Sequence, residues 1–146
     1  MMVAASAPMQ NPAPPRSFLA FDFGTRRVGV ATGNTLLGRA QALRTVAEVG
    51  DARFKALGAL IDEWQPQALV VGVPFHPDGA EHENTLKARR FARQLQGRFK
   101  LPVHEVDERY STTEAIAGLA KAGGADVDAA SAAIILDQFL RSLESS

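Results

Sequence analysis

The stretch from residue 18 to residue 33 most constrains the fold, because it is apolar almost throughout and yet carries one carboxylate, that of Asp22. The chain turns at Gly24, beside Arg26 and Arg27, and then continues as a second apolar run. This pattern predicts a buried strand, a tight turn and an antiparallel partner strand. A carboxylate buried in a strand is costly unless a metal ion, a cationic partner or a strand-end position compensates it. The rest of the chain decides which of these three compensates the charge of Asp22.

The length of the chain predicts a single domain, since 146 residues bury roughly two thirds of their unfolded surface in one core. Residues 1–16 contain four of the eight prolines and show no apolar periodicity, so we expect a disordered tail there and the domain over 17–143. The sequence contains no cysteine, no apolar run long enough to span a bilayer and no secretory signal. These absences predict a soluble, cytoplasmic protein.

The apolar periodicity predicts an α/β fold with a mixed five-stranded sheet, in which three antiparallel strands are followed by parallel additions. Helices are expected on both faces of this sheet, because each parallel crossover covers a face. The glycines at 24, 29 and 33 lack the G-x-G-x-x-G spacing of dinucleotide-binding folds, which excludes a Rossmann fold. The predicted strands are 17–23, 27–32, 39–46, 68–73 and 102–106, and the predicted helices are 51–64, about 84–99, 111–122 and 128–143.

Three acidic residues, Asp22, Glu108 and Asp128, lie on an apolar strand or at the end of a predicted element. If the first strand is central, the end of the fifth strand and the start of the last helix can both approach it. Converging carboxylates repel one another unless divalent cations lie between them. Carboxylate oxygens suit Mg²⁺ or Mn²⁺, and two such ions can support hydrolysis of a phosphodiester. The three acids thus predict a metal-dependent hydrolytic site.

Two of these acids also have a purely structural interpretation. Asp22 could form a buried salt bridge with Arg26 or Arg27. Glu108 could pair with Arg109 on a solvated turn, and taken alone that pairing is the better explanation of the residue.

The third acid, Asp128, is placed to cap the last helix, and this role would explain it without a metal. Asp126 is expected to be a solvated loop acid, although it lies close enough in sequence to replace Asp128 at the site.

The charges are unevenly distributed, although the formal net charge is zero. The segment from Lys87 to Lys100 carries six basic residues and no acidic one. The predicted helix offers Lys87, Arg90 and Arg93 no acid four residues away, which favours a polyanionic partner over an ordinary solvated face.

Four motifs occur in order along the chain. They are Asp-Phe-Gly-Thr-Arg-Arg-Val-Gly-Val-Ala at 22–31, Val-Gly-Val-Pro at 71–74 with Asp-Gly at 78–79, Asp-Glu-Arg-Tyr-Ser-Thr-Thr-Glu-Ala at 107–115 and Val-Asp-Ala-Ala-Ser-Ala at 127–132. Taken together, they resemble the YqgF family, also called RuvX, whose members are assigned to pre-16S rRNA cleavage. The resemblance covers about residues 17–140 and implies the ribonuclease H-like fold of the related RuvC-type Holliday junction resolvases. It also implies a metal-dependent endonuclease that matures the 5′ end of 16S rRNA.

The same resemblance assigns catalytic and metal-binding roles to Asp22, Glu108 and Asp128, with Mg²⁺ or Mn²⁺, and two ions, as the expected cofactor. The chain departs from many relatives in having no lysine just before its last motif, where Lys121 is the nearest basic residue. A Holliday junction resolvase acting on branched DNA and a non-catalytic domain that binds rRNA or a ribosomal subunit are the alternatives. Either a monomer or a homodimer is compatible with these functions. The residues expected to contact nucleic acid are Arg26, Arg27, Lys87, Arg90, Arg93, Arg109, Ser111 and Thr112.

Overall fold

The computed structural model of the chain describes residues 15–108 and 126–144, and its centre is a five-stranded sheet in the order β3-β2-β1-β4-β5. β1 pairs antiparallel with β2, and β2 with β3, whereas β4 runs parallel to both β1 and β5. The predicted mixed five-stranded sheet is therefore confirmed, and the first strand is central in it, which is the condition under which the three acids can converge. The strands are β1 (Ser17–Phe23), β2 (Val28–Asn34), β3 (Ala40–Val46), β4 (Ala68–Val73) and β5 (Val103–Asp107).

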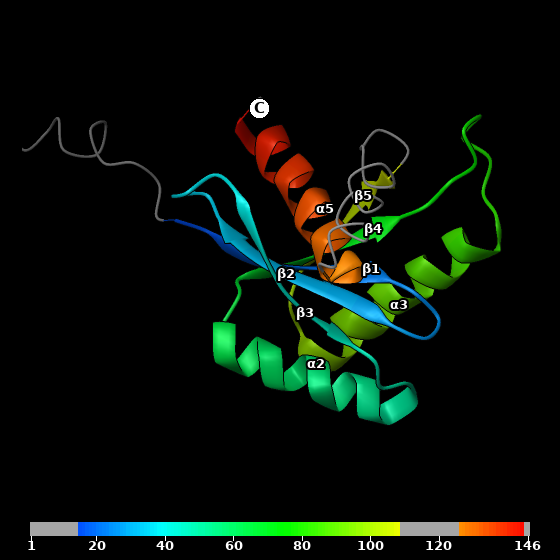
Figure 1. Cartoon of the computed structure of the whole chain (residues 1–146), viewed down its shortest axis with the longest axis horizontal. Coiled ribbons are helices and arrows are strands. Elements are labelled where there is room, and N and C mark those ends of the chain that lie inside the picture. Colours follow the sequence, from blue (N-terminus) through cyan, green and yellow to red (C-terminus); the bar gives the residue numbers. More distant parts are fainter. Residues whose placement is uncertain (1–14, 109–125, 145–146) are drawn as a thin grey trace, which may run out of the picture.

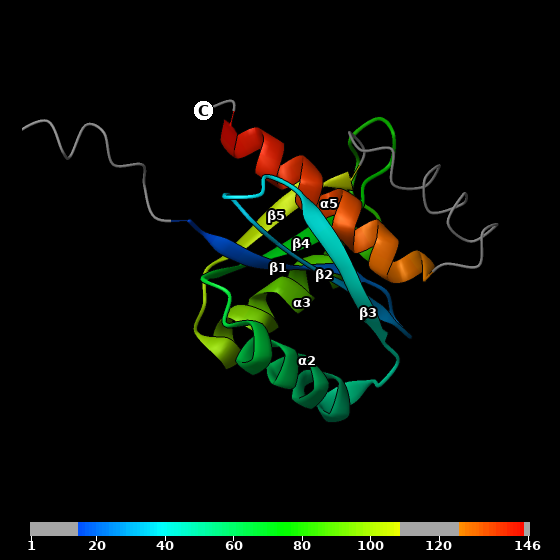
Figure 2. The ribbon, with the colours of Figure 1, turned by 60° about the vertical axis from the view of Figure 1, so that its left-hand side comes forward.

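The described helices cover both faces of this sheet, as the apolar strands required (Figures 1 and 2). α2 (Gly50–Trp64) and α3 (Glu83–Phe99) lie on one face, and α5 (Val127–Glu144) lies on the other. The helix predicted at 111–122 and the tail predicted at 1–16 fall largely or wholly outside the described residues, so both stay predictions. No helix in the described ranges is long and apolar enough to cross a membrane.

Alternation along β1 decides which face carries the acidic residue. Leu19 and Phe21 belong to the core beneath α2 and α3, whereas Phe18 and Ala20 belong to the core beneath α5. Since successive side chains of a strand point to opposite faces, Asp22 lies on the α5 face. The first strand thus delivers its carboxylate to the side of the sheet on which the last helix packs.

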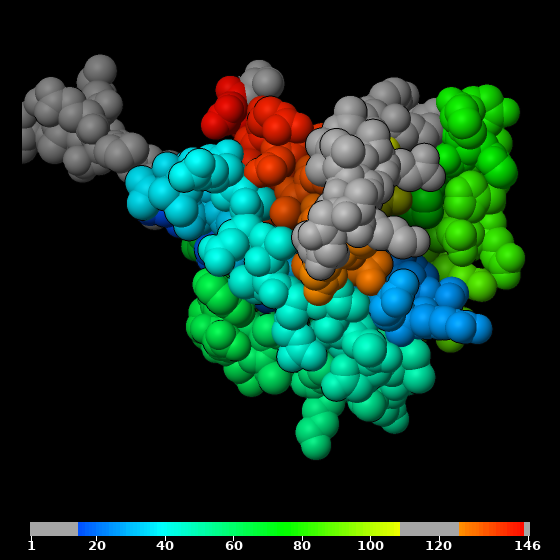
Figure 3. Space-filling model, viewed as in Figure 1, coloured from blue at the N-terminus to red at the C-terminus, as the bar shows by residue number. Residues whose placement is uncertain are grey.

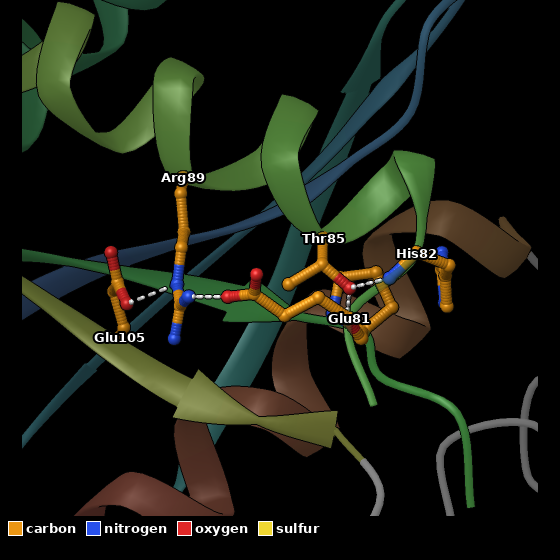
Figure 4. A network of polar contacts seen from close by, with 6 residues as sticks. Glu81, His82, Thr85, Arg89 and Glu105 are labelled. Atoms are coloured by element: carbon orange, nitrogen blue, oxygen red, sulfur yellow. Dashed lines mark hydrogen bonds and ion pairs between the residues drawn. The ribbon is translucent and has the colours of Figure 1, made fainter. Parts of the chain in front are cut away.

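The loop between β4 and α3 is fixed by a network of polar contacts (Figure 4). Arg89 forms ion pairs with Glu81 in the loop and with Glu105 on β5. The buried Thr85 donates a hydrogen bond to the carbonyl of Pro74, at the end of β4. The loop that leaves β4 is therefore held against both neighbouring elements.

The start of α3 corrects the expectation that Lys87 has no acidic partner on its own helix. The imidazole of His82 accepts a hydrogen bond from the backbone N–H of Asn84 and caps the helix, which then begins at Glu83. Glu83 therefore lies in the first turn, and its carboxylate is 3.1 Å from the Lys87 ammonium. The prediction was wrong because it began the helix one residue too late.

Candidate active site

Four residues form a row across the α5 face of the sheet. Gly29 on β2 pairs with Thr45 on β3 on one side and with Asp22 on β1 on the other. Phe21 pairs with Val71, so the residues that follow them in these parallel strands, Asp22 and Gly72, lie side by side. Asp22 is thus flanked by a glycine on each neighbouring strand, and neither glycine covers its carboxylate with a side chain.

Gly29 allows the last helix to lie directly on the sheet. A Cβ atom at this position would overlap the backbone carbonyl oxygen of Asp128. The first turn of α5 therefore rests on β2 at a distance that no other residue type permits. The absence of a side chain at Gly29 is what brings Asp128 to the strand pair that carries Asp22.

Gly72 has the same effect for Glu108, which directly follows β5. A Cβ atom at Gly72 would lie only 2.7 Å from Oε1 of Glu108 and 2.5 Å from Cδ1 of Ile135. The Glu108 side chain thus reaches across β4, and it hydrogen bonds with the carboxyl group of Asp22. The structure accordingly brings together the three acids that the sequence singled out, Asp22, Glu108 and Asp128.

The electrostatics of Asp22 show that its charge is poorly compensated. Burial, together with the nearby carboxylate of Asp128, raises the pKa of Asp22 to about 6, against the opposing effect of the hydrogen bonds from Glu108 and Ser131. The salt bridge considered for Asp22 is not the one formed, because in the described chain Arg27 pairs with Asp128. A cation placed among these carboxylates would remove the repulsion.

Arg27 occupies the open side of the site. Its Nε lies 3.1 Å from Oδ2 of Asp128, and its side chain is 65% exposed. A cleft of about 470 Å³ begins here, lined by Arg27, Thr45, Asp126, Val127 and Asp128. Figure 3 shows the first turn of α5, in orange, at the surface between the blue turn after β1 and the cyan of β3. The cleft is thus lined by a basic side chain and a carboxylate next to each other at the molecular surface.

A larger cleft of about 580 Å³ runs between β5 and α5, but it suits a polyanion less well. Its lining includes the acidic Glu105 and Asp107 and no lysine or arginine among the described residues. The cleft at Arg27 also contains two carboxylates, those of Asp126 and Asp128, but of the two clefts it alone offers a phosphate group an arginine.

Asp126, rather than Asp128, caps α5. Its Oδ1 accepts a hydrogen bond from the backbone N–H of Ala129 at 3.0 Å and another from the Thr45 hydroxyl. Burial raises the pKa of Asp126, but these hydrogen bonds, one from the Asp128 N–H and the charge of Arg27 outweigh burial and hold it below its usual value. The capping role expected for Asp128 was wrong, because the helix begins at Val127 and places Asp128 inside its first turn. Asp126 is an exposed loop acid, as expected, but it also caps the helix.

Sequence reasoning did not assign a role to Ser131, whose buried side chain hydrogen bonds with Asp22. The available signal was its spacing: it follows Asp128 by three residues and so lies on the same helix face. Gly29 and Gly72 were also missed, since their importance follows from strand register, which the sequence does not reveal.

The carboxylate oxygens of this site are of the chemical type that binds a divalent cation. Carboxylate oxygens are the ligands that Mg²⁺ and Mn²⁺ prefer, and the pKa of Asp22, raised mainly by burial and also by the charge of Asp128, shows that its negative charge is disfavoured in the metal-free protein. Within 15–108 and 126–144, however, no three histidine, aspartate or glutamate side chains already form a group that could hold a metal ion. A bound cation would have to replace the contact between Asp22 and Glu108 and the ion pair between Arg27 and Asp128.

The structure does not bring all expected nucleic-acid contacts to this site. Lys87, Arg90 and Arg93 lie on α3, which packs on the opposite face of the sheet from α5. Only the turn with Arg26 and Arg27 adjoins the cleft, and Arg26 is exposed there. The remaining three expected contacts, Arg109, Ser111 and Thr112, lie outside the described residues.

Comparison with protein families places these residues in a known context. Residues 16–142 match the family model RuvX, described as Holliday junction resolvase. A protein of Albidiferax ferrireducens, named as a candidate pre-16S rRNA nuclease, is 61% identical over 145 residues, which cover 97% of this chain and 90% of the relative. A protein of Polaromonas sp. with the same name is 66% identical over 128 residues, covering 88% and 90% of the two chains.

Solved structures with a similar fold include that of Thermus thermophilus RuvC in complex with a Holliday junction substrate. It matches with a TM-score of 0.54 over 88% of this chain and 96% of its own, at 14% identity. A second structure of the same RuvC gives a TM-score of 0.53. At this identity the match establishes the fold alone, and it confirms the ribonuclease H-like architecture.

Proposed function

The chain belongs to the RuvX family, and from this premise we propose that it is a nuclease that hydrolyses phosphodiester bonds in the maturation of the 5′ end of 16S rRNA. The names of relatives that are 57–66% identical support this function. The observation that supports assigning this function to particular residues is that Asp22, Glu108 and Asp128 lie close together at one end of the sheet. A half-buried carboxylate between two others has little structural use, whereas a metal-dependent phosphodiesterase requires such a group.

We assign the three carboxylates to the binding of Mg²⁺ or Mn²⁺, in one or two ions. When bound, such ions polarise a phosphate and lower the pKa of water. Asp22 is the central ligand in this proposal, because both other acids approach it. Ser131 orients the carboxyl group of Asp22 through its hydrogen bond. Arg27 lies at the mouth of the cleft, where it can bind a phosphate oxygen and leave Asp128 to the metal.

The substrate in this proposal is structured RNA, held by its phosphates. Arg26 and Arg27 would bind it beside the cleft, and the exposed Arg90 and Arg93 would contact a more distant part of a folded RNA. Lys87 contributes less than the sequence predicted, because Glu83 partly neutralises it. Arg109, Ser111 and Thr112 are assigned to substrate contacts through their family motif. A cytoplasmic location, with action on a ribosomal subunit as a monomer or homodimer, completes the proposal.

A cleavage assay tests this function directly. The purified protein is incubated with Mn²⁺ and a precursor that carries the 5′ end of 16S rRNA, and in parallel with a four-way DNA junction. We expect cleavage of the precursor by the wild type and none by Asp22→Asn. Asp62→Asn is the matched control, because this exposed aspartate on α2 lies on the far side of the sheet from Asp128. Full activity of Asp22→Asn would exclude the assigned metal ligands.

Two other functions have some support. The family description and the likeness to RuvC favour a resolvase, which would cut the junction in preference to the precursor. The contact of Asp22 with Glu108 and the ion pair of Arg27 with Asp128 engage the carboxylates within the protein, which favours a domain that binds rRNA without cutting it. Calorimetric titration with Mn²⁺ distinguishes this RNA-binding domain from a nuclease, since a domain that binds no metal ion would show no heat of binding at millimolar Mn²⁺.

A further inference from the structure

One buried cation has no part in the function described so far. Arg53, in the first turn of α2, is only 6% exposed. Its Nη2 donates a hydrogen bond to the carbonyl of Thr25, and its Nε donates one to the carbonyl of Glu48, both at 3.1 Å. The guanidinium also lies over the ring of Phe23, 5.6 Å from the centroid. Arg53 thus ties the turn after β1 to the connection that precedes α2.

A structural role in the core does not by itself require an arginine at this position. Burial lowers the pKa of Arg53, so the charged side chain is held there at a cost. None of the ion pairs in the described ranges includes Arg53. An apolar residue would fill the same space without that cost. Only a long, forked donor, however, can bind two backbone carbonyls on separate segments.

The segment that Arg53 holds is the one that carries the basic residues of the site. β1 and β2 pair up to Phe23 and Val28, so residues 24–27 form the whole connection between them. Thr25, Arg26 and Arg27 are all exposed. A short, exposed turn without an anchor would let its arginines sample many positions. The bond from Arg53 to the Thr25 carbonyl supplies an anchor from beneath.

We propose that Arg53 is a positioning residue, which acts through the turn at 24–27 to hold Arg27 at the mouth of the cleft and Arg26 beside it. The proposal rests on the proposed function, in which these two arginines bind phosphate groups of RNA. Arg53 itself touches neither the carboxylates nor the substrate.

Two variants and one control test this role. Arg53→Met keeps the length and packing of the side chain and removes its donors, while Arg53→Lys retains the charge and can reach one carbonyl. Lys55→Met, two residues along the same helix, removes an equal charge from an exposed position. Affinity for the precursor RNA is measured by fluorescence anisotropy in EDTA, so that no cleavage occurs. We expect about tenfold weaker binding for Arg53→Met, since small displacements of binding groups are costly. Arg53→Lys should lie between Arg53→Met and the wild type, and Lys55→Met should change affinity less than twofold.

A double-variant comparison separates positioning from general destabilisation. In a background of Arg26→Ala with Arg27→Ala, adding Arg53→Met should weaken RNA binding no further, because the residues through which it acts are gone. An undiminished tenfold loss in that background would overturn the proposal. Equal losses from Arg53→Met and Lys55→Met would do so too.

Hydrogen exchange keeps the test independent of the substrate. Mass spectrometry of the peptide that covers residues 24–27 should show at least tenfold faster amide exchange in Arg53→Met than in the wild type, with α5 unaffected. If the wild type binds no RNA, the proposed function fails, yet the exchange rates still decide whether Arg53 orders the turn. Unchanged exchange would refute the positioning role.

Discussion

The Nε atom of Arg27 lies 3.1 Å from Oδ2 of Asp128, so a guanidinium is paired with one of the carboxylates that the proposed function assigns to a metal ion. Arg27→Ala should therefore strengthen Mn²⁺ binding, because the ion no longer competes with the guanidinium. The pair is partly exposed and worth at most about 1 kcal/mol, so we expect up to about a fivefold gain in affinity. The same variant should bind RNA more weakly. Calorimetry with Mn²⁺ and anisotropy with RNA measure the two effects.

Arg26→Ala is the control for this prediction, because Arg26 is a neighbouring exposed arginine and forms none of the ion pairs between described residues. It removes the same charge from the same turn. If both variants strengthened Mn²⁺ binding equally, the effect would come from the net charge of the turn and not from the contact with Asp128.

The carboxyl group of Asp22 makes the metal-free protein sensitive to pH. Burial raises its pKa from 3.8 to about 6, so between these values the folded state binds more protons than the unfolded state. The stability of the metal-free protein should therefore fall as pH rises from 4 to 6, by up to about 3 kcal/mol through this group. Above pH 6 the cost stays constant. Urea unfolding in EDTA at pH 4 and pH 8 measures most of this fall.

Asp22→Asn has no such proton to lose and should be more stable than the wild type in EDTA at pH 8. In Mn²⁺ the order should reverse, because only the wild type gains binding energy from the ion. A variant that is less stable than the wild type in EDTA would show that the carboxylate of Asp22 is compensated within the protein itself.

The sequence revealed the acids of this site but not the reason for their proximity. Asp22 stood out because a charge interrupts an apolar strand, and the order of elements correctly predicted a mixed five-stranded sheet. The approach of Glu108 and Asp128 depends on Gly72 and Gly29, and these glycines become meaningful only when register places both beside Asp22. The sequence also failed to identify Asp126 as the cap of α5. The position of this side chain depends on a hydrogen bond from Thr45, which lies on a strand far away in the sequence.

The close contact between β2 and α5 predicts a large effect of a single methyl group. Gly29→Ala would push its Cβ into the carbonyl of Asp128 and force the first turn of α5 away from the sheet. We expect a loss of about 1–3 kcal/mol in unfolding free energy, as for other overpacked sites, together with weaker Mn²⁺ binding. Gly97→Ala is the matched control, since nothing lies within 4 Å of a Cβ at this helical position and the change should stabilise α3. Equal stability of the two variants would contradict the packing argument.

Asp126 and Asp128 lie two residues apart, yet their substitutions should have opposite consequences. Asp126→Ala removes the side chain that accepts hydrogen bonds from the Ala129 N–H and the Thr45 hydroxyl, so it should cost about 1 kcal/mol of stability. Because these bonds lower the pKa of Asp126, their contribution should be fully present above pH 4 and lost as pH falls further. Asp128→Ala breaks only a partly exposed ion pair and should change stability by less than half as much. It should, however, abolish Mn²⁺ binding and RNA cleavage, which Asp126→Ala should largely retain. Urea unfolding and the precursor assay, applied to both variants, would contradict this division if Asp128→Ala proved the less stable protein or the more active nuclease.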